Sequence, residues 1–161
     1  MLEACYEKAI ETLKNCSTKN GLFASGPPRG YNSIWSRDST IAFLGAYLEP
    51  EFKPQILKTI EVLSKYQSSH GQIPNCIDLF SERKKQVTFA TIDSTLWYII
   101  LHHIYKNNYN DSLYRKYKNN IKKALAWVKY QNINENLLPA QLPTTDWQDI
   151  FPHKYGYTIN T

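Results

Sequence analysis

Residues 91–101 read Thr-Ile-Asp-Ser-Thr-Leu-Trp-Tyr-Ile-Ile-Leu, and the second half of this stretch decides the fold. From Leu96 to Leu101 every residue is apolar or aromatic, so a helix formed there has no polar face. A helix that is apolar all round has to be buried by other elements. We therefore predict an inner helix over this stretch, buried on every side by neighbouring helices.

Amphipathic helices are predicted on both sides of this inner helix. Apolar residues recur at helical spacing in each of them, and loops containing glycine and proline separate them. No stretch shows the alternating pattern with paired turn signals that a sheet requires. The fold class is therefore all-α. The expected ranges are residues 2 to about 15–20, 38–49, 54–67 and 112–131.

A weak internal repeat indicates how these helices are organised. Lys65-Tyr66-Gln67 recurs as Lys129-Tyr130-Gln131, each time at the end of an outer helix and before a proline-containing loop. The loops lead to Asp38, Asp93 and Asp149, which are 55 and 56 residues apart. Two helices with their connections have that length, so the pattern predicts an array of helical hairpins.

Composition bounds the class of protein. With 161 residues, 42% hydrophobic and 14% aromatic, the chain has the size and apolar content of one domain with its own core. The net charge of +5 fits a solvated face on the helix over residues 112–131 better than a nucleic-acid surface. No segment is long and uncharged enough to suggest a signal peptide or a membrane span.

The cysteines and histidines do not indicate a metal or a cofactor. Cys5, Cys16 and Cys76 are an odd set without metal-ligand spacing, so neither disulfides nor zinc are expected, and a cytoplasmic location follows. His102 and His103 lie in the apolar helix and are expected to be core or edge residues. We expect no metal, no cofactor, no nucleic acid and no membrane among the partners.

Carboxylates and tryptophans gather at the starts of the inner helices. In a stack of antiparallel hairpins these starts meet at one mouth, which brings together Trp35-Ser36-Arg37-Asp38, Asp93 and Asp146-Trp147-Gln148-Asp149. Carboxylates and guanidinium groups bond sugar hydroxyls, and an indole covers the apolar face of a pyranose. Cleaving a glycosidic bond needs one protonated carboxyl and one carboxylate. The pattern therefore predicts a sugar site.

A structural interpretation stays open for several of these residues. Asp38 and Asp93 precede Ser or Thr and an apolar run, so each could be a helix N-cap. Trp97 fits the core better than a sugar platform. Asp146 and Asp149 lie in a loop flanked by prolines, where capping is the less obvious explanation, so they are the better candidates for chemistry.

Three segments resemble a known family in order and spacing. Residues 31–42, with Trp35-Ser36-Arg37-Asp38, resemble the Trp-x-Arg-Asp segment of amylo-alpha-1,6-glucosidases, glucoamylases and related six-hairpin glycosidases. Residues 91–101 are similar to the second such segment, which neutral invertases share. Thr145-Asp146-Trp147-Gln148-Asp149, followed by residues 155–160, resembles the third. The resemblance to the glucosidase module of glycogen-debranching enzymes covers residues 22–161.

The resemblance implies an (α/α)6 toroid and an inverting mechanism with two acids. Asp149 matches the general acid by its position in the third segment. Arg37 and Asp38 would hold the hydroxyls of the terminal glucose, Asp93 would line the same subsite, and Trp35 and Trp147 would shape it, with Asp146 beside them. The general base is expected as a glutamate in a later hairpin, which this sequence does not contain.

The chain is therefore expected to be a single partial domain over residues 1–161, about the first half of the toroid, truncated at its C-terminus or completed by another polypeptide. Alone it should have little hydrolase activity. The leading hypothesis is a glycosidase acting on alpha-1,6 branch points of glycogen-like glucans. The alternatives are a neutral-invertase-like or glucoamylase-like hydrolase of the same fold, or a non-catalytic helical-repeat or sugar-binding module. The exact linkage and the oligomeric state stay open.

Overall fold

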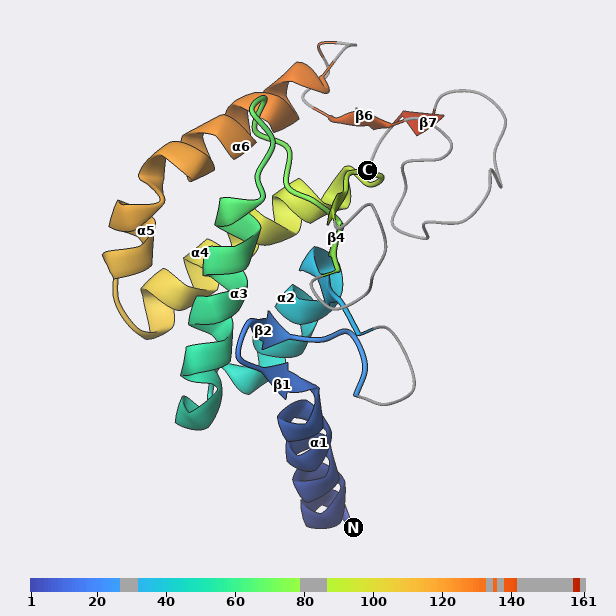
Figure 1. Ribbon diagram of the computed structural model, residues 1–161, viewed down its shortest axis with the longest axis vertical. Coiled ribbons are helices and arrows are strands. Elements are labelled where there is room, and N and C mark those ends of the chain that lie inside the picture. The colour runs from blue at the N-terminus through green and yellow to red at the C-terminus, as the bar shows by residue number, and fades with distance from the viewer. Residues whose placement is uncertain (27–31, 79–86, 133–134, 136–137, 142–157, 160–161) are drawn as a thin grey trace.

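The protein is mainly helical, with α4 packed against α2, α3, α5 and α6 and with α1 projecting from the body (Figure 1). The computed structural model describes residues 1–26, 32–78, 87–132, 135, 138–141 and 158–159. The helices are α1 (Leu2–Cys16), α2 (Ser36–Ala46), the 3-10 turn η1 (Pro50–Phe52), α3 (Lys53–Lys65), α4 (Asp93–Asn108), α5 (Ser112–Lys116) and α6 (Lys118–Tyr130).

The core lies where α2, α3 and α4 meet. Tyr98 and Leu101 of α4 are fully buried, together with Phe43 of α2 and Ile60 of α3. The Tyr98 hydroxyl shares a 2.7 Å hydrogen bond with Ser64 Oγ, so its buried polar group is paired. The apolar helix predicted from the sequence is therefore the central packing element of the described structure.

One side of α4 departs from the prediction that it is buried all round. Leu96 and Trp97 are only half-buried, and Ile100 is 38% exposed. These residues lie on the same face of the helix as Asp93, since they follow it at helical spacing. The prediction was wrong for this face because no described element covers it.

The outer helix predicted over residues 112–131 is two helices. α5 ends and α6 begins around Tyr117, whose backbone (φ −106°, ψ 20°) leaves helical geometry. Leu113 of α5 and Ile121 of α6 are both buried, and the Tyr117 ring lies 6.1 Å from the His102 ring. The break divides the helix into two parts that pack separately against α4.

Short strands connect the helices, although the sequence pattern shows none. Each strand is two residues long, which is too short for an alternating pattern to be visible, and most of the partners are distant in sequence. All pairings are antiparallel. The sheets are β1 (Ser17–Thr18) with β2 (Gly21–Leu22), then β3 (Ile34–Trp35), β4 (Cys76–Ile77) and β5 (Val87–Thr88) in that order, and β6 (Ala140–Gln141) with β7 (Thr158–Ile159).

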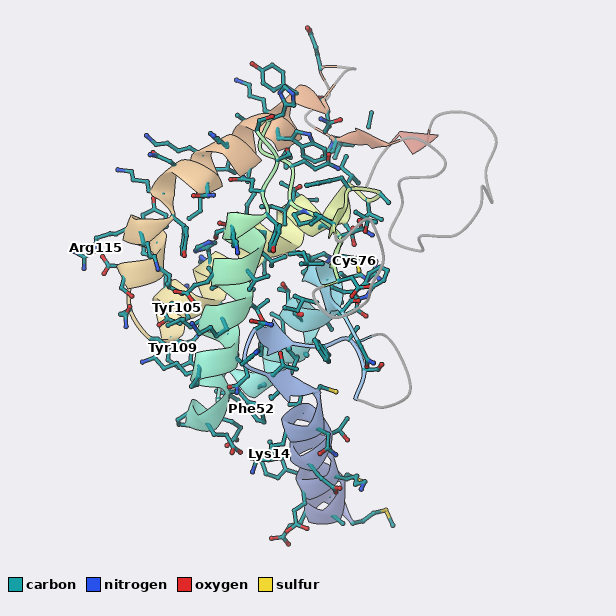
Figure 2. All side chains as sticks on the ribbon, in the orientation of Figure 1. Lys14, Phe52, Cys76, Tyr105, Tyr109 and Arg115 are labelled. Atoms are coloured by element: carbon teal, nitrogen blue, oxygen red, sulfur yellow. The ribbon has the colours of Figure 1, made fainter. Side chains whose placement is uncertain are left out.

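α2 and α4 lie side by side and run in the same direction. At their starts, Ser36 Oγ donates a 2.9 Å hydrogen bond to the carbonyl oxygen of Ser94. Beyond their ends, the Tyr109 hydroxyl donates to the carbonyl oxygen of Tyr47 at 2.8 Å, and Figure 2 shows Tyr109 at that end of the molecule. The starts of the two helices therefore meet at one edge. None of the described helices has the length and apolar composition needed to cross a bilayer.

His102 gives the fold an acid sensitivity. Its side chain is 3% exposed, and within the described residues neither ring nitrogen has a hydrogen-bond partner. Burial lowers the pKa of His102 from 6.5 to about 4. Between pH 6.5 and pH 4 the ring takes up a proton in the unfolded chain but stays neutral in the folded protein. The free energy of unfolding is therefore unaffected by His102 above pH 6.5 and decreases as the pH falls from 6.5 toward 4.

We expect the free energy of unfolding to fall by about 2 kcal/mol between pH 7 and pH 4.5 on account of His102 alone. Urea unfolding across this range measures it. His102→Leu should remove this part of the pH dependence, whereas His103→Leu, at an exposed position one residue along, should leave it in place. An equal pH dependence in the wild type and His102→Leu would contradict the assignment.

Candidate functional site

Arg37, Asp38 and Asp93 form one cluster at the edge where α2 and α4 begin. Arg37 Nη2 lies 3.2 Å from Asp38 Oδ2, and Arg37 Nη1 lies 3.7 Å from Asp93 Oδ2. The Arg37 and Asp93 side chains are only 18% and 16% exposed, and Asp38 is 39% exposed. One guanidinium thus lies between two carboxylates, two of the three groups being largely shielded from water.

Local sequence and helix packing together produce this cluster. Arg37 and Asp38 are in the first turn of α2, and Asp93 is the first residue of α4. Arg37 and Asp38 are neighbours along the chain, whereas Asp93 reaches them only because the two helices run parallel from the same edge. The positive ends of both helix dipoles lie there and interact favourably with carboxylates.

The N-cap interpretation of the two aspartates is wrong. The N-cap of α2 is Trp35 and that of α4 is Ile92, and neither helix has a side-chain cap hydrogen bond. Asp38 and Asp93 lie inside their helices, one or more residues after the cap position. Helix capping therefore does not account for either carboxylate.

One oxygen atom of the Asp93 carboxylate is free to accept a hydrogen bond. Its Oδ2 atom is buried and accepts no hydrogen bond from any described residue, although Arg37 lies 3.7 Å away. A buried carboxylate oxygen that accepts no hydrogen bond lowers the stability of the folded protein, unless a ligand or water donates a hydrogen bond to it. A ligand hydroxyl that donates to this atom would satisfy it while the guanidinium held a neighbouring oxygen.

The other predicted site residues are only partly placed. Trp35 is half-buried in β3, opposite Cys76 of β4, and Figure 2 shows Cys76 beside the start of α2. Trp97 is half-buried on the exposed side of α4, one turn after Asp93, and it is not part of the buried core cluster in which the sequence interpretation placed it. Residues 145–149 of the third predicted segment lie outside the described residues, and with them Asp146, Trp147 and Asp149.

A buried network of small polar residues underlies the cluster, and sequence reasoning missed it. Besides donating to Ser94, Ser36 donates its backbone N–H to the Asn75 carbonyl oxygen at 3.1 Å. The Ser94 hydroxyl shares a 2.8 Å hydrogen bond with the Thr91 hydroxyl, and the Asn75 side chain accepts from the Ala90 backbone N–H at 2.9 Å. The available signal was the shared enrichment in Ser and Thr around both aspartates.

The cluster is chemically suited to hold hydroxyl groups. It offers guanidinium donors and carboxylate acceptors within one small area, the arrangement that pairs of neighbouring sugar hydroxyls can bridge. A metal centre has no support within the described part of the chain, where no three potential ligands come together. Chemically, such an arrangement can bind and orient a polar neutral ligand.

Comparison with known proteins adds an independent finding. Residues 10–138 match the family model described as amylo-alpha-1,6-glucosidase. The matched range contains Trp35, Arg37, Asp38 and Asp93, and it ends before the third predicted segment. No curated protein and no solved structure matches the chain.

Proposed function

The chain belongs to the amylo-alpha-1,6-glucosidase family, and we propose that it carries the terminal-glucose subsite of a glycosidase that cleaves alpha-1,6 branch points of glycogen-like glucans. The observation that carries the proposal is the cluster of Arg37, Asp38 and Asp93, with an unused buried acceptor on Asp93. Family membership supports glycosidase activity on glucans in general. The preference for alpha-1,6 branch points is part of our proposal.

In the proposed mechanism the glycosidic bond breaks with inversion. Asp149 donates its proton to the leaving oxygen, while a carboxylate from a later helical hairpin removes a proton from the attacking water. Arg37, Asp38 and Asp93 hold the hydroxyls of the terminal glucose, so that its anomeric carbon faces the acid. Their binding energy would orient the ring between acid and base.

We propose that Trp35, Trp147 and Asp146 complete the subsite. An indole face covers the apolar face of a pyranose, and a further carboxylate accepts hydroxyl hydrogens. Trp35 is adjacent to the Arg37–Asp38 pair because β3 leads directly into α2. This proximity supports Trp35 as the indole that contacts the terminal sugar.

We further propose that the ring of helices is closed by hairpins that another segment or polypeptide supplies, giving an (α/α)6 toroid. The support is a set of large apolar side chains that the described residues leave exposed on α2, just after its end and on α4. Exposed fractions are 49% for Ile41, 46% for Leu44, 69% for Leu48 and 38% for Ile100. Large apolar side chains left exposed in this number are expected to be covered by another element.

The proposed setting is a reducing cytoplasm. The three cysteines all lie in the described part of the chain, and none forms a disulfide. A cytoplasmic compartment keeps thiols in this state. Its polymeric glucans would be the natural substrates.

Glucose release tests the proposal. The chain alone should not release glucose from isomaltose or from a limit dextrin, because we place the general base in a later hairpin outside these 161 residues. Joined to, or co-expressed with, a polypeptide that supplies the later hairpins, it should release glucose from both at ordinary enzyme rates, at least ten times faster than from maltose or sucrose.

The preferred substrate distinguishes the proposed enzyme from each of the alternatives. Preference for maltose would indicate a glucoamylase-like enzyme, and preference for sucrose an invertase-like one. Full activity of the chain alone would refute the need for a second half. No hydrolysis of any substrate by a folded, completed protein would favour a non-catalytic helical module.

A further inference from the structure

Side-chain hydroxyls of α2 contact α4 beneath the cluster: that of Ser36 at the helix starts and, one turn further along, that of Thr40, whose Oγ1 lies 3.4 Å from the carbonyl oxygen of Trp97. Ser36 is fully buried, and its Oγ donates at 2.9 Å to the carbonyl oxygen of Ser94, the residue that follows Asp93. Ser36 itself immediately precedes Arg37. One hydrogen bond therefore joins the residues next to both members of the Arg37–Asp93 pair.

Further contacts fix both ends of this link. On the α2 side, the Ser36 carbonyl oxygen accepts a 2.8 Å hydrogen bond from Thr40 Oγ1. On the α4 side, the Ser94 hydroxyl pairs with Thr91 at 2.8 Å, and both side chains are buried. Both of these bonds are local and order the backbone at each end of the link, whereas a shift of one helix start relative to the other would break the buried Ser36–Ser94 hydrogen bond.

We propose that Ser36 is a positioning residue for the Arg37–Asp93 pair. By holding the start of α4 against the start of α2, its hydroxyl sets the distance between the guanidinium and the carboxylate. The inference rests on the proposed function in one respect, that this pair binds sugar hydroxyls. Two charged groups that bind neighbouring hydroxyls have to stand at a fixed distance from each other. A shift of about an ångström in that distance weakens binding and slows catalysis.

Ser39 provides a matched control within the same helix. It is also fully buried, and its Oγ donates to a backbone carbonyl oxygen, that of Leu22 at 3.1 Å. This bond joins α2 to β2, whereas the Ser36 bond joins α2 to α4. Ser36→Ala and Ser39→Ala therefore each remove one buried hydrogen bond of the same type, but only the first loosens the pair.

The experiment measures affinity for 1-deoxynojirimycin, a cationic analogue of glucose, by isothermal titration calorimetry, alongside urea unfolding. The variants are Ser36→Ala, Ser39→Ala, Asp93→Asn and the double variant Ser36→Ala/Asp93→Asn. We expect Ser36→Ala to raise Kd by about tenfold and Ser39→Ala by less than about twofold, with comparable losses of stability. In the Asp93→Asn background, Ser36→Ala should add less than about twofold.

Equal Kd values for Ser36→Ala and Ser39→Ala, with binding weakened by Asp93→Asn, would overturn the positioning role and leave the proposed function standing. Absence of binding by the wild type, or binding unchanged by Asp93→Asn, would count against the proposed function instead. In that case the role of Ser36 is tested without a ligand. A double-mutant cycle of Arg37→Met and Asp93→Asn, measured by urea unfolding, gives the coupling free energy between the two side chains, once with Ser36 present and once in the Ser36→Ala background. A coupling reduced by about half or more in the Ser36→Ala background supports the inference, and an unchanged coupling overturns it.

Discussion

Replacing Asp149 with asparagine is expected to lower kcat for isomaltose by about a thousandfold or more in a protein completed by the later hairpins that we propose. The amide has no acidic proton to give to the leaving glycosidic oxygen, so the departing alcohol has to leave as an alkoxide. The measurement is the initial rate of glucose release at saturating isomaltose.

A substrate whose leaving group departs without being protonated provides the control for Asp149. Fluoride leaves without protonation, so Asp149→Asn should hydrolyse alpha-glucosyl fluoride at a rate within about tenfold of the wild type. Asp146→Asn, at a residue proposed to bind substrate, should raise KM more than it lowers kcat. Equal losses on both substrates in Asp149→Asn would show that this residue is not the proton donor.

Replacing Gly71 with alanine is expected to lower the free energy of unfolding by at least about 3 kcal/mol. Gly71 follows α3 and has φ +102°, a conformation that residues with a Cβ rarely adopt. An added Cβ would also overlap the carbonyl oxygen of Lys123 in α6, where no flexible side-chain end can move aside. Denaturant unfolding followed by far-ultraviolet circular dichroism measures the loss.

Gly45 is the matched control for this substitution. It lies in α2, and a Cβ added there meets no atom within 4 Å. Gly45→Ala should be neutral or stabilising by up to about 1 kcal/mol, because alanine favours a helix over glycine. A small effect at Gly71 would mean that the loop after α3 does not lie against α6 as described.

The helices could be predicted because their apolar spacing is local information. α1 and α3 lie within two residues of their predicted ranges, and the repeated Lys-Tyr-Gln tripeptides end α3 and α6 as expected. The break at Tyr117 was not predictable, since it reflects packing of both halves against α4. The short strands were equally hidden, because β3 pairs with β4, which lies about forty residues away in sequence.

The candidate site could be predicted only in part. Arg37 and Asp38 stand together in the sequence, and parallel inner helices explain why Asp93 reaches them. The buried acceptor on Asp93 and the role of Ser36 depend on interhelical contacts that no spacing reveals. The roles of Asp146, Trp147 and Asp149 remain predictions, since these residues lie outside the described part of the chain.

We propose that the starts of α2 and α4 form a binding site for a terminal glucose unit. An NMR titration of the labelled chain with isomaltose tests it directly, with mannitol as the control ligand. We predict saturable shifts largest at the Arg37 guanidinium, the Asp93 carboxylate and their backbone amides, and lost in Asp93→Asn. Unchanged signals from these groups at saturating isomaltose, or changes confined to residues far from the two helix starts, would contradict it.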